Sequence, residues 1–593
     1  MNDTKPTWKK RLRLKRQSRF LKKHARRAEG ATTRHARRFL VNRWDKIREI
    51  RLHVIGWFTG VGLLIGITGL QMIWLQQSYV HLAPVSGGTY AEAVKGPIQT
   101  LNPLFATTPA EISATKLIFS SLYKYDTTGN LHGDVATAIS SKNDQEFTVS
   151  LRHDVKWHDG KSLTAKDVVF TVNLMRDPSS RSVVAASWQG IAAELVDEYT
   201  VRFLLPASYA AFPHALTFPI LPYHLLESVD PTSLRENAYS IKPVGSGPFS
   251  FQLLQTVNGV GDRRIVYLNA NETYYEGRPR LDRMQLYAYK DDDTVNQALR
   301  TSEVTGASDI SSDVASTVDS NKFKVLTRPV NSGVYAIFNL SNSLLKDKKI
   351  RTALRLATDT HAIRNDLYGQ PNSLYLPFIT RQVTGASKIA EPKSNVSAAI
   401  KLLEKEGWKL KDGIRTKKNQ ELRFRLVTRR NVEYEVALKT LISQWSSLGI
   451  KIDAEVFDTS DISKSFPGDI LQPRNYDILI DELVIGADPD VYAFWHSGGQ
   501  SNFSNYGSDV SDDALASARE KSNPALRSAK YLAFARQWLS DIPAIGLYQS
   551  NLIYVHTKST RVIGDDEVIV GPNAHYASVK YWTAEVGRVF KTP

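Results

Sequence analysis

The sequence predicts a mixed α/β protein with a two-lobed body, preceded by one membrane-spanning helix. Three observations support this. The chain has 593 residues, too many for one ordinary hydrophobic core, so two or more lobes are expected. Alternating strand patterns and amphipathic helix patterns mix throughout residues 87–593, with no repeat of 20–50 residues. An uncharged stretch of 22 residues, 54–75, lies near the N-terminus.

The basic residues are concentrated in an N-terminal tail. The net charge is +16, but residues 1–51 hold 19 Lys and Arg against four Asp and Glu, which is +15 and leaves +1 for the rest. The body is therefore close to neutral, unlike a typical nucleic-acid-binding domain. The chain has no Cys, which excludes disulfides, Cys-ligated zinc, thiol nucleophiles and a lipid-bearing N-terminal Cys.

Residues 54–76 are predicted to cross a membrane. The 22 uncharged residues span roughly 33 Å as a helix, enough for a bilayer core. Trp57 and Trp74 lie near its ends, as in an aromatic belt. The basic tail, residues 1–53, lies on one side only, which places the N-terminus in the cytoplasm and the body outside the cell membrane. A cleaved signal peptide is disfavoured because no A-x-A site follows, and a buried soluble helix is the weaker alternative.

The tail itself has more than one interpretation. Its Lys and Arg residues, with scattered Leu and Phe, are suited to anionic lipid on the inner leaflet or to nucleic acid. The membrane interpretation is preferred because the tail is joined to a membrane helix. A tail that only sets the topology of the helix explains the charge equally well.

The body begins after a short linker, residues 77–86. Helices are predicted where apolar residues recur every three or four positions, and strands where they alternate. The predicted helices are 109–125, 164–175, 349–356, 396–406, 433–448, 512–520 and 526–539. The predicted strands are 87–94, 146–152, 155–158, 421–428, 476–480, 544–549 and 553–556, with a strand entered at Phe249, strand and turn alternating over 325–339, and a loop at 486–501.

One stretch, L-R-H-D-V-K-W-H-D-G-K-S-L-T-A-K-D (residues 151–167), concentrates residues that metals and catalysts use. His153 and His158 are five apart on a predicted strand, so they point to opposite faces and cannot share a metal ion. Asp159 precedes a Gly and indicates a turn, and Asp167 stands three residues after Thr164, as in a capping box. The stretch is therefore predicted to be scaffold, with no catalytic residue and no metal site.

A series of motifs in order along residues 87–555 resembles the family 5 extracellular solute-binding proteins, the dipeptide-, oligopeptide- and nickel-binding receptors of ABC importers. The matching pieces are G-G-T-Y, T-L-N-P-L-F, I-F-S-S-L-Y-K-Y-D, F-T-V-S-L-R-H-D-V-K-W-H-D-G-K-S-L-T-A-K-D-V-V-F-T, P-V-G-S-G-P-F, Y-A-I-F-N, I-R-T-A-L-R-L-A-T-D, A-D-P-D-V-Y and N-F-S-N-Y. Each piece is weak by itself. The ordered series, and above all the W-H-D-G-x-x-L-T-A-x-D-V-x-F block, is specific.

The resemblance implies a periplasmic-binding-protein-like fold of the large peptide-binding type. One lobe would be built from residues 87–329 and a return segment, 541–593, and the second from residues 330–540. The ligand would lie in the cleft between the lobes, which close by hinge motion. Such a protein is not an enzyme and needs no cofactor. The sequence agrees, because it contains no G-x-S-x-G and no H-E-x-x-H motif.

The resemblance also suggests ligand-binding residues. In peptide-binding members an Asp before the D-P-D-like loop holds the peptide's α-amino group, but here that position is Ile485. Asp481 or Glu482 is the candidate replacement, and since neighbours on a strand face opposite ways, at most one is expected to face the cleft. Further candidates are a helix-start Glu and three aromatic residues, for each of which packing in the core is the alternative. They are Glu111, Trp188, Tyr492 and Trp495.

We therefore expect a membrane-anchored, monomeric receptor outside the cytoplasm. It would bind peptides and deliver them to an ABC import permease. Two alternatives stay open. The same fold also serves other solutes, such as a nickel chelate or an oligosaccharide, and a receptor with one membrane helix is also able to signal ligand occupancy through its basic tail.

Overall fold

The computed structural model of the protein describes residues 51–257, 263–458, 464–571 and 573–590. The chain divides into two compact units. The first contains residues 1–83 and 587–593, and the second contains residues 84–586. Most of the basic tail predicted for residues 1–53 lies outside the described residues.

The described part of the first unit is a long helix and a two-stranded ribbon. Helix α3 (Arg51–Tyr79) has 29 residues, and its segment Arg51–Trp74 is the one helix in the described part of the chain that is long and apolar enough to cross a membrane. Trp57 and Trp74 are 67% and 63% exposed. Strand β1 (Val80–Val85) pairs with β21 (Glu585–Phe590). The segment predicted as a linker, residues 77–86, thus comprises the end of α3 and β1.

A ten-stranded mixed sheet organises the second unit, in the order β18-β17-β19-β13-β20-β12-β2-β11-β10-β9. Strand β17 runs parallel to β18 and β19, and β2 runs parallel to β11 and β12, whereas β13 and β20 are antiparallel to each other. The bounds are β2 Thr89–Lys95, β9 Phe249–Val257, β10 Arg263–Ala270, β11 Arg283–Tyr289, β12 Gly306–Ala307, β13 Phe323–Phe338, β17 Arg423–Arg429, β18 Lys451–Phe457, β19 Ile478–Val484 and β20 Ala544–Thr557.

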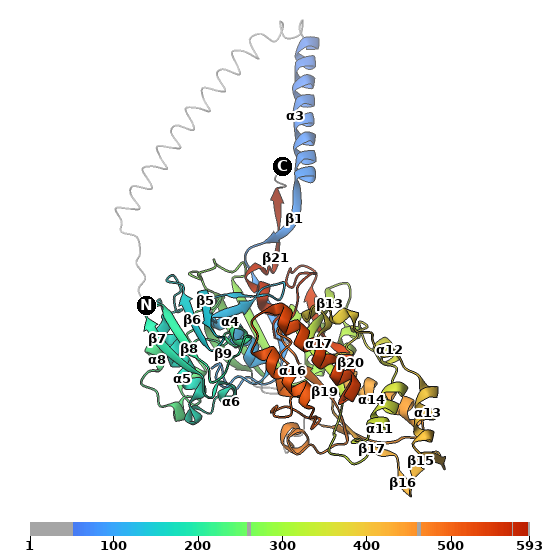
Figure 1. Cartoon of the computed structure of the whole chain (residues 1–593). Coiled ribbons are helices and arrows are strands. Elements are labelled where there is room, and N and C mark those ends of the chain that lie inside the picture. Colours follow the sequence, from blue (N-terminus) through green and yellow to red (C-terminus); the bar gives the residue numbers. More distant parts are fainter. Residues whose placement is uncertain (1–50, 258–262, 459–463, 572, 591–593) are drawn as a thin grey trace. The chain divides into compact units, whose positions relative to one another are not determined.

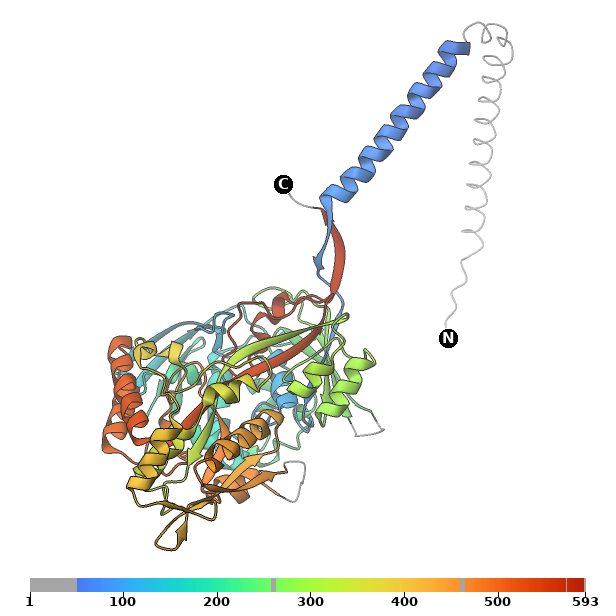
Figure 2. The ribbon, with the colours of Figure 1, turned by 90° about the vertical axis from the view of Figure 1, so that its right-hand side faces the viewer.

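Strands β13 and β20 are longer than predicted. Strand β13 has 16 residues where strand and turn were predicted to alternate, and β20 has 14 residues where two strands were predicted. Figure 2 shows the two strands side by side at the centre of the sheet. The pairing of β13 with β20 shifts register between Pro329 and Gly333, so these turn-like residues lie within the continuous strand. A bulge and a turn tolerate the same residues, so the sequence pattern does not separate them.

The other strands form small sheets. A four-stranded antiparallel sheet has the order β5-β6-β8-β7, and β3 pairs with β4. The bounds are β3 Tyr123–Tyr125, β4 Leu131–Gly133, β5 Ala136–Lys142, β6 Glu146–Leu151, β7 Ala192–Asp197, β8 Thr200–Leu204, β14 Lys409–Lys411, β15 Ile414–Lys417 and β16 Gln420–Glu421. The strand predicted at 155–158 is absent; only an isolated bridge joins Lys156 to Ser162.

Helices surround the sheets, and α16 and α17 lie against each other (Figure 1). The longer helices are α4 Pro109–Ile118, α5 Ala165–Arg176, α9 Asp292–Arg300, α10 Ser312–Thr317, α11 Lys348–Ala357, α12 Thr360–Asn365, α13 Val396–Lys405, α14 Val432–Ser446, α16 Asp509–Arg519 and α17 Pro524–Asp541. The single-turn helices are α6 Ala185–Trp188, α7 Phe212–Ala215, α8 Tyr223–Leu226 and α15 Tyr492–Trp495. Helix α15 lies within the segment predicted to be a loop.

The helix predicted over 109–125 ends at Ile118. The reason is a tertiary contact. The N–H of Gly247 donates to the carbonyl of Ile118 at 2.8 Å, in place of the N–H that a further helical turn would supply. The chain then becomes extended at Phe119 and continues into β3. The periodicity of residues 109–125 cannot show that the carbonyl of Ile118 binds a segment more than a hundred residues away.

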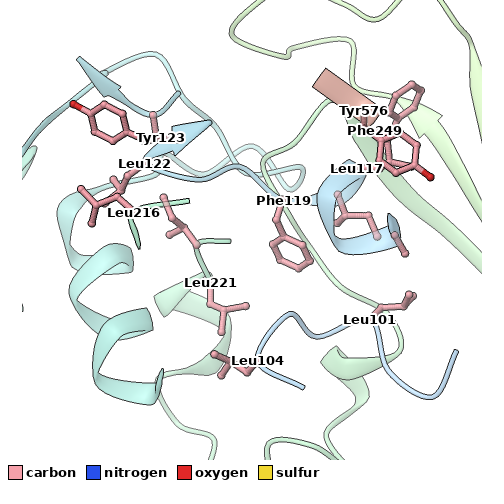
Figure 3. Close-up of a cluster of buried hydrophobic side chains, with 14 of the residues drawn as sticks. Leu101, Leu104, Leu117, Phe119, Leu122, Tyr123, Leu216, Leu221, Phe249 and Tyr576 are labelled. Atoms are coloured by element: carbon pink, nitrogen blue, oxygen red, sulfur yellow. The ribbon is translucent and has the colours of Figure 1, made fainter. Parts of the chain in front are cut away.

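In the part of the chain that the structure describes, buried apolar residues form four clusters. Two draw on residues before 331 and after 551, and the other two draw on residues 334–548. Figure 3 shows part of the first cluster, where Leu117 and Phe119 of the α4 segment lie near Leu101 and Leu221. Strands β13 and β20 contribute to both sets of clusters, so they join two separately packed regions of the body.

Candidate functional site

The second unit contains a cavity of about 850 Å³. Both sets of hydrophobic clusters contribute to its walls: Val330 and Leu552 belong to one set, and Val334 and Tyr548 to the other. The other lining residues fall within five short segments, 290–293, 309–311, 367–371, 429–435 and 550–553, joined by Lys95, Asp458 and Glu482. The cavity therefore lies where β13 and β20 pass from one packed region to the other.

The sheet topology explains why polar side chains gather there. Lys95 and Arg429 end the parallel strands β2 and β17, and Lys290 and Asp458 directly follow their parallel neighbours β11 and β18. In open α/β sheets, ligands bind outside the carboxyl ends of parallel strands, because the following loops diverge there. The cavity has this position in two separate parts of the sheet.

Strand β19 divides the predicted pair of carboxylates between its two faces. Asp481 is 5% exposed, and its Oδ1 accepts from Arg429 Nε at 3.0 Å. Burial raises the pKa of Asp481, and the Arg429 guanidinium opposes that rise. Glu482 lines the cavity and accepts from the Tyr434 hydroxyl at 3.4 Å. Of the two, Glu482 is the one that reaches the cavity.

Asp309, which no sequence motif marks, also lines the cavity. It follows the short strand β12 and has a φ of +53°, a conformation that Asp tolerates better than most residues. Asp309 is exposed at the cavity surface, and its pKa is raised to about 6, first because the cavity walls displace part of the surrounding water, against the effect of Lys95. The carboxylates of Glu482, Asp292 and Glu433 raise it further.

Glu433 and Tyr548 complete this corner of the cavity. Glu433 lies in the first turn of α14, and its Oε1 accepts from the N–H of Ser312 at 3.3 Å. Tyr548 lies on β20 and is 3% exposed, and its hydroxyl has no hydrogen-bond partner among the described groups. Burial, then Glu433 and Glu482, raises the pKa of Tyr548. No local sequence pattern marks these residues, although their places just after strands or at a helix start are the available signal.

Glu111 lies in a different environment and does not line the cavity. It is 2% exposed at the start of α4, where it forms a capping box with Thr108. Its Oε1 accepts the N–H groups of Gln99 and Thr100 at 2.8 and 3.2 Å. Its Oε2 accepts those of Thr107 and Thr108 at 2.9 and 3.1 Å. This carboxylate thus holds the entry loop of the helix.

The three predicted aromatic residues also lie outside the cavity lining. Trp188 is 5% exposed and packs edge-on against Phe218. Trp495 is 1% exposed and packs against Trp538. Tyr492 stacks on His496 at 4.0 Å. Packing accounts for each of them, so a contact with ligand in this cavity remains a prediction for Glu482 alone among the six sequence candidates.

The His- and Asp-rich stretch is built into the scaffold. His158 accepts from the N–H of Gly245 at 3.2 Å through Nδ1, and its Nε2 donates to the carbonyl of Gly247 at 3.1 Å. His153 instead stacks on Tyr199 at 4.0 Å. Asp167 accepts the N–H of Thr164 at 2.8 Å, as predicted for a capping box. Among the described residues, no three His, Cys, Asp or Glu side chains converge to hold a metal ion.

Comparison with known proteins gives a consistent result. The sequence model of the bacterial extracellular solute-binding proteins, family 5 (middle), matches residues 130–505. The chain is 28% identical over 486 residues to the oligopeptide-binding protein AppA of Bacillus subtilis, covering 79% of this chain and 87% of AppA. It is 30% identical over 461 residues to a Brucella ovis protein described as an ABC transporter peptide-binding protein, covering 74% and 83%.

Two solved structures superpose with a TM-score of 0.69 at 25% identity, each covering 84% of this chain and 99% of the other. One is AppA from Bacillus subtilis in complex with a nonapeptide, and the other is NikZ from Campylobacter jejuni in complex with Ni(L-His). These similarities confirm the predicted fold class.

Proposed function

Because the chain belongs to family 5 of the bacterial extracellular solute-binding proteins, we propose that it is a membrane-anchored receptor that binds peptides in its 850 Å³ cavity. The family consists of substrate-binding proteins of ABC transporters, so the protein binds a solute and is not an enzyme. In the proposed function it delivers the peptide to an ABC import permease.

The cavity is the observation that carries the proposal. Its volume is within the range of about 300–1,000 Å³ that small-ligand sites occupy. AppA, which shares this fold at 25% identity, is solved with a nonapeptide. NikZ shares the fold equally well and is solved with a nickel–histidine complex, so a metal chelate is the second candidate solute.

We place the ligand between two lobes with the boundaries expected from the sequence, residues 87–329 with 541–593 and residues 330–540. Two observations support a division into two lobes: the hydrophobic clusters divide within β13 and β20, and both sets of clusters line the cavity. The clusters put the second boundary within β20 and not at 541, because Ile545, Leu547 and Tyr548 pack with the second lobe. Bending within the paired strands β13 and β20 would then open and close the cavity around its solute.

Within the cavity, Glu482 is the proposed contact for the peptide's α-amino group. Supporting this, its carboxylate lines the cavity with only a long hydrogen bond from Tyr434 at 3.4 Å. Glu482→Gln keeps the shape and removes the charge, and it is expected to weaken binding of a free-amine peptide while leaving its N-acetylated form unaffected.

The proposal is tested by native mass spectrometry of the full-length protein in lipid nanodiscs, followed by denaturing release of any copurified solute. A ladder of short peptides of mixed sequence supports the peptide receptor. A single nickel-containing species, or an empty protein whose melting temperature no peptide pool raises, contradicts it and directs the search to chelates or sugars.

We also propose that α3 anchors the protein in the cell membrane with its N-terminus in the cytoplasm. The uncharged helix and the one-sided basic tail support this topology. Because the chain has no Cys, single Cys residues placed at Ser18 and at Ser86 report the topology directly. In intact cells a membrane-impermeant maleimide is expected to label Ser86→Cys and not Ser18→Cys, and labelling of both after lysis is the control.

A further inference from the structure

The cavity carries an excess of negative charge. Its lining includes eight acidic residues, Asp291, Asp292, Asp293, Asp309, Glu433, Glu435, Asp458 and Glu482. It includes four basic residues, Lys95, Lys290, Arg429 and Arg430. The net charge of the lining is therefore −4, on a body whose overall net charge is close to zero.

The basic residues are already neutralised by neighbours. Lys95 pairs with Asp292 at 3.3 Å, and Lys290 pairs with Asp291 at 3.5 Å. Arg430 pairs with Asp458 at 3.5 Å. Arg429 pairs with Asp481, which lies outside the lining, at 3.0 Å. Each cation in the cavity wall thus has an ion-pair partner outside the remaining carboxylates, on which only Lys95, toward Asp309, and Arg429, toward Glu482, also act.

Five lining carboxylates have no ion pair with any described residue, namely Asp293, Asp309, Glu433, Glu435 and Glu482. Three of them, Asp309, Glu433 and Glu482, come from separate parts of the fold. The negative charges of Glu433 and Glu482 raise the pKa of Asp309 and that of Tyr548. Glu433 and Glu482 each accept one neutral hydrogen bond, which orients the carboxylate without balancing its charge. Unpaired like charges that line one cavity are costly unless a ligand of opposite sign arrives.

A second observation points to a ligand at the same place. The hydroxyl of Tyr548 is buried, lines the cavity and has no hydrogen-bond partner among the described groups. Buried hydroxyls in native proteins almost always have a partner, so this one is available to a bound molecule. Glu433, Glu482 and Tyr548 line the same cavity, and both carboxylates raise the pKa of Tyr548.

The part of the cavity lined by Asp309, Glu433, Glu482 and Tyr548 suits an organic cation better than it suits a bare metal ion. No three acidic or His side chains of the described chain converge closely enough to coordinate a metal. Carboxylates spread around a cavity instead suit an ammonium or guanidinium group, which donates several hydrogen bonds in different directions.

We propose that the cavity selects solutes with at least two positive charges, so that a bound peptide carries a Lys or Arg side chain in addition to its α-amino group. The α-amino group lies at Glu482, as proposed above, and the side-chain cation lies between Asp309 and Glu433, in the corner of the cavity that Tyr548 also lines. This inference rests on the proposed function in taking the solute to be a peptide. The requirement for a second cation follows from the charges of the cavity itself.

The test is isothermal titration calorimetry on the full-length protein in nanodiscs. The probes are alanine peptides of four to nine residues carrying one Lys, the matched peptides carrying Gln, and 1,5-diaminopentane. Both peptide series carry the α-amino charge, so their difference isolates the second charge. Lys peptides are expected to bind at least tenfold more tightly than Gln peptides, with the advantage falling as salt concentration rises.

Isosteric amide variants then locate the site. Asp309→Asn keeps a side chain that tolerates the positive φ, and Glu433→Gln keeps its carbonyl acceptor for Ser312. Each of these two is expected to reduce the Lys-over-Gln preference at least threefold, whereas Glu482→Gln is expected to weaken Lys and Gln peptides alike. Asp513→Asn, which changes an exposed carboxylate on α16, is the matched control and is expected to leave the preference unchanged.

The outcomes separate the two proposals. Equal binding of Lys and Gln peptides overturns the charge inference and leaves the peptide receptor standing. Binding of diaminopentane that Asp309→Asn and Glu433→Gln weaken, with no binding of any peptide, supports the charge inference and overturns the peptide function. Failure of every probe to bind overturns both.

Discussion

At the scale of single residues, Glu111 illustrates how a polar side chain near a helix start acquires a structural role. Its two carboxylate oxygens accept four backbone N–H groups in a site that is 2% exposed. Glu111→Gln replaces one acceptor by a donor facing two of those N–H groups. We expect a loss of about 2 kcal/mol in the free energy of unfolding, measured by urea titration.

The same variant tests whether Glu111 contacts the ligand. With the protein folded, the affinity for peptide is expected to equal that of the parent, because Glu111 does not line the cavity. Asp513→Asn is the exposed control for the stability measurement. Weaker binding with unchanged stability would contradict the structural role.

Asp309 gives the cavity a pH dependence. Desolvation, with the carboxylates of Glu482, Asp292 and Glu433, raises its pKa to about 6 against the effect of Lys95. Asp309 is therefore mostly ionised at pH 7 and mostly protonated at pH 5. For a cationic ligand held by this carboxylate, the affinity is expected to fall about tenfold between these pH values.

The sign is opposite for the stability of the empty protein. A carboxyl with a pKa raised above its unfolded value binds its proton more tightly when folded. Its contribution is therefore present at low pH and is lost as the pH rises through about 6. Asp309→Asn is expected to flatten both profiles. Identical pH profiles for the variant and the parent would show that another group titrates.

At the scale of elements, the contact between two sequence motifs fixes the fold of the first region. The W-H-D-G turn supplies His158, which binds the backbone of the P-V-G-S-G-P segment at Gly245 and Gly247. That segment presses on the end of α4, where a Cβ on Gly245 would lie 2.0 Å from the carbonyl oxygen of Ile118. Only Gly allows this approach, because the obstacle is backbone that cannot rotate away.

Gly245→Ala is therefore expected to destabilise the protein by at least about 3 kcal/mol or to prevent folding. Gly571→Ala is the matched control, since nothing lies within 4 Å of its Cβ position. Thermal unfolding followed by circular dichroism measures both variants. A Gly245→Ala protein as stable as Gly571→Ala would show that the segment does not approach the helix as closely as described.

At the scale of the whole body, Arg519 joins the two packed regions. Its guanidinium lies 4.6 Å from the Tyr209 ring centroid and 4.5 Å from that of Tyr492, and its Nε is 3.0 Å from Asp490 Oδ2. Tyr209 packs on the first hydrophobic cluster and Tyr492 on the third. The side chain is thus a clamp between regions that the proposed hinge would separate.

Removing this clamp is expected to favour the open form. Arg519→Ala lowers the fraction of binding-competent molecules, so the apparent affinity for peptide is expected to weaken about three- to tenfold. Arg519→Lys is expected to recover only part of it, since an ammonium does not stack between two rings. Arg536→Ala, an exposed change on α17, is the control.

Small-angle scattering adds a second measurement. The empty Arg519→Ala protein is expected to have a larger radius of gyration than the parent and to approach the parent value with saturating peptide. Unchanged scattering together with unchanged affinity would contradict the clamp.

The sequence by itself determined the features that depend on local pattern. The uncharged length of 54–76 predicts the long helix α3, the Thr164–Asp167 spacing predicts the start of α5, and the ordered motifs predict the family and the fold. The same local reasoning assigns Asp159 and Asp167 to turn and cap, and so removes the apparent metal site. These features involve neighbours in the chain, which the sequence displays directly.

Only the tertiary structure decided the features that depend on distant segments. Helix α4 ends where the N–H of Gly247 binds the carbonyl of Ile118. The continuity of β13 and β20 depends on their pairing with each other. Trp188 and Trp495 are buried by contacts with other elements. The corner formed by Asp309, Glu433, Glu482 and Tyr548 comes from four separate elements. No pattern within any one of them records that they line one cavity, because the sheet order that brings them together is set by packing.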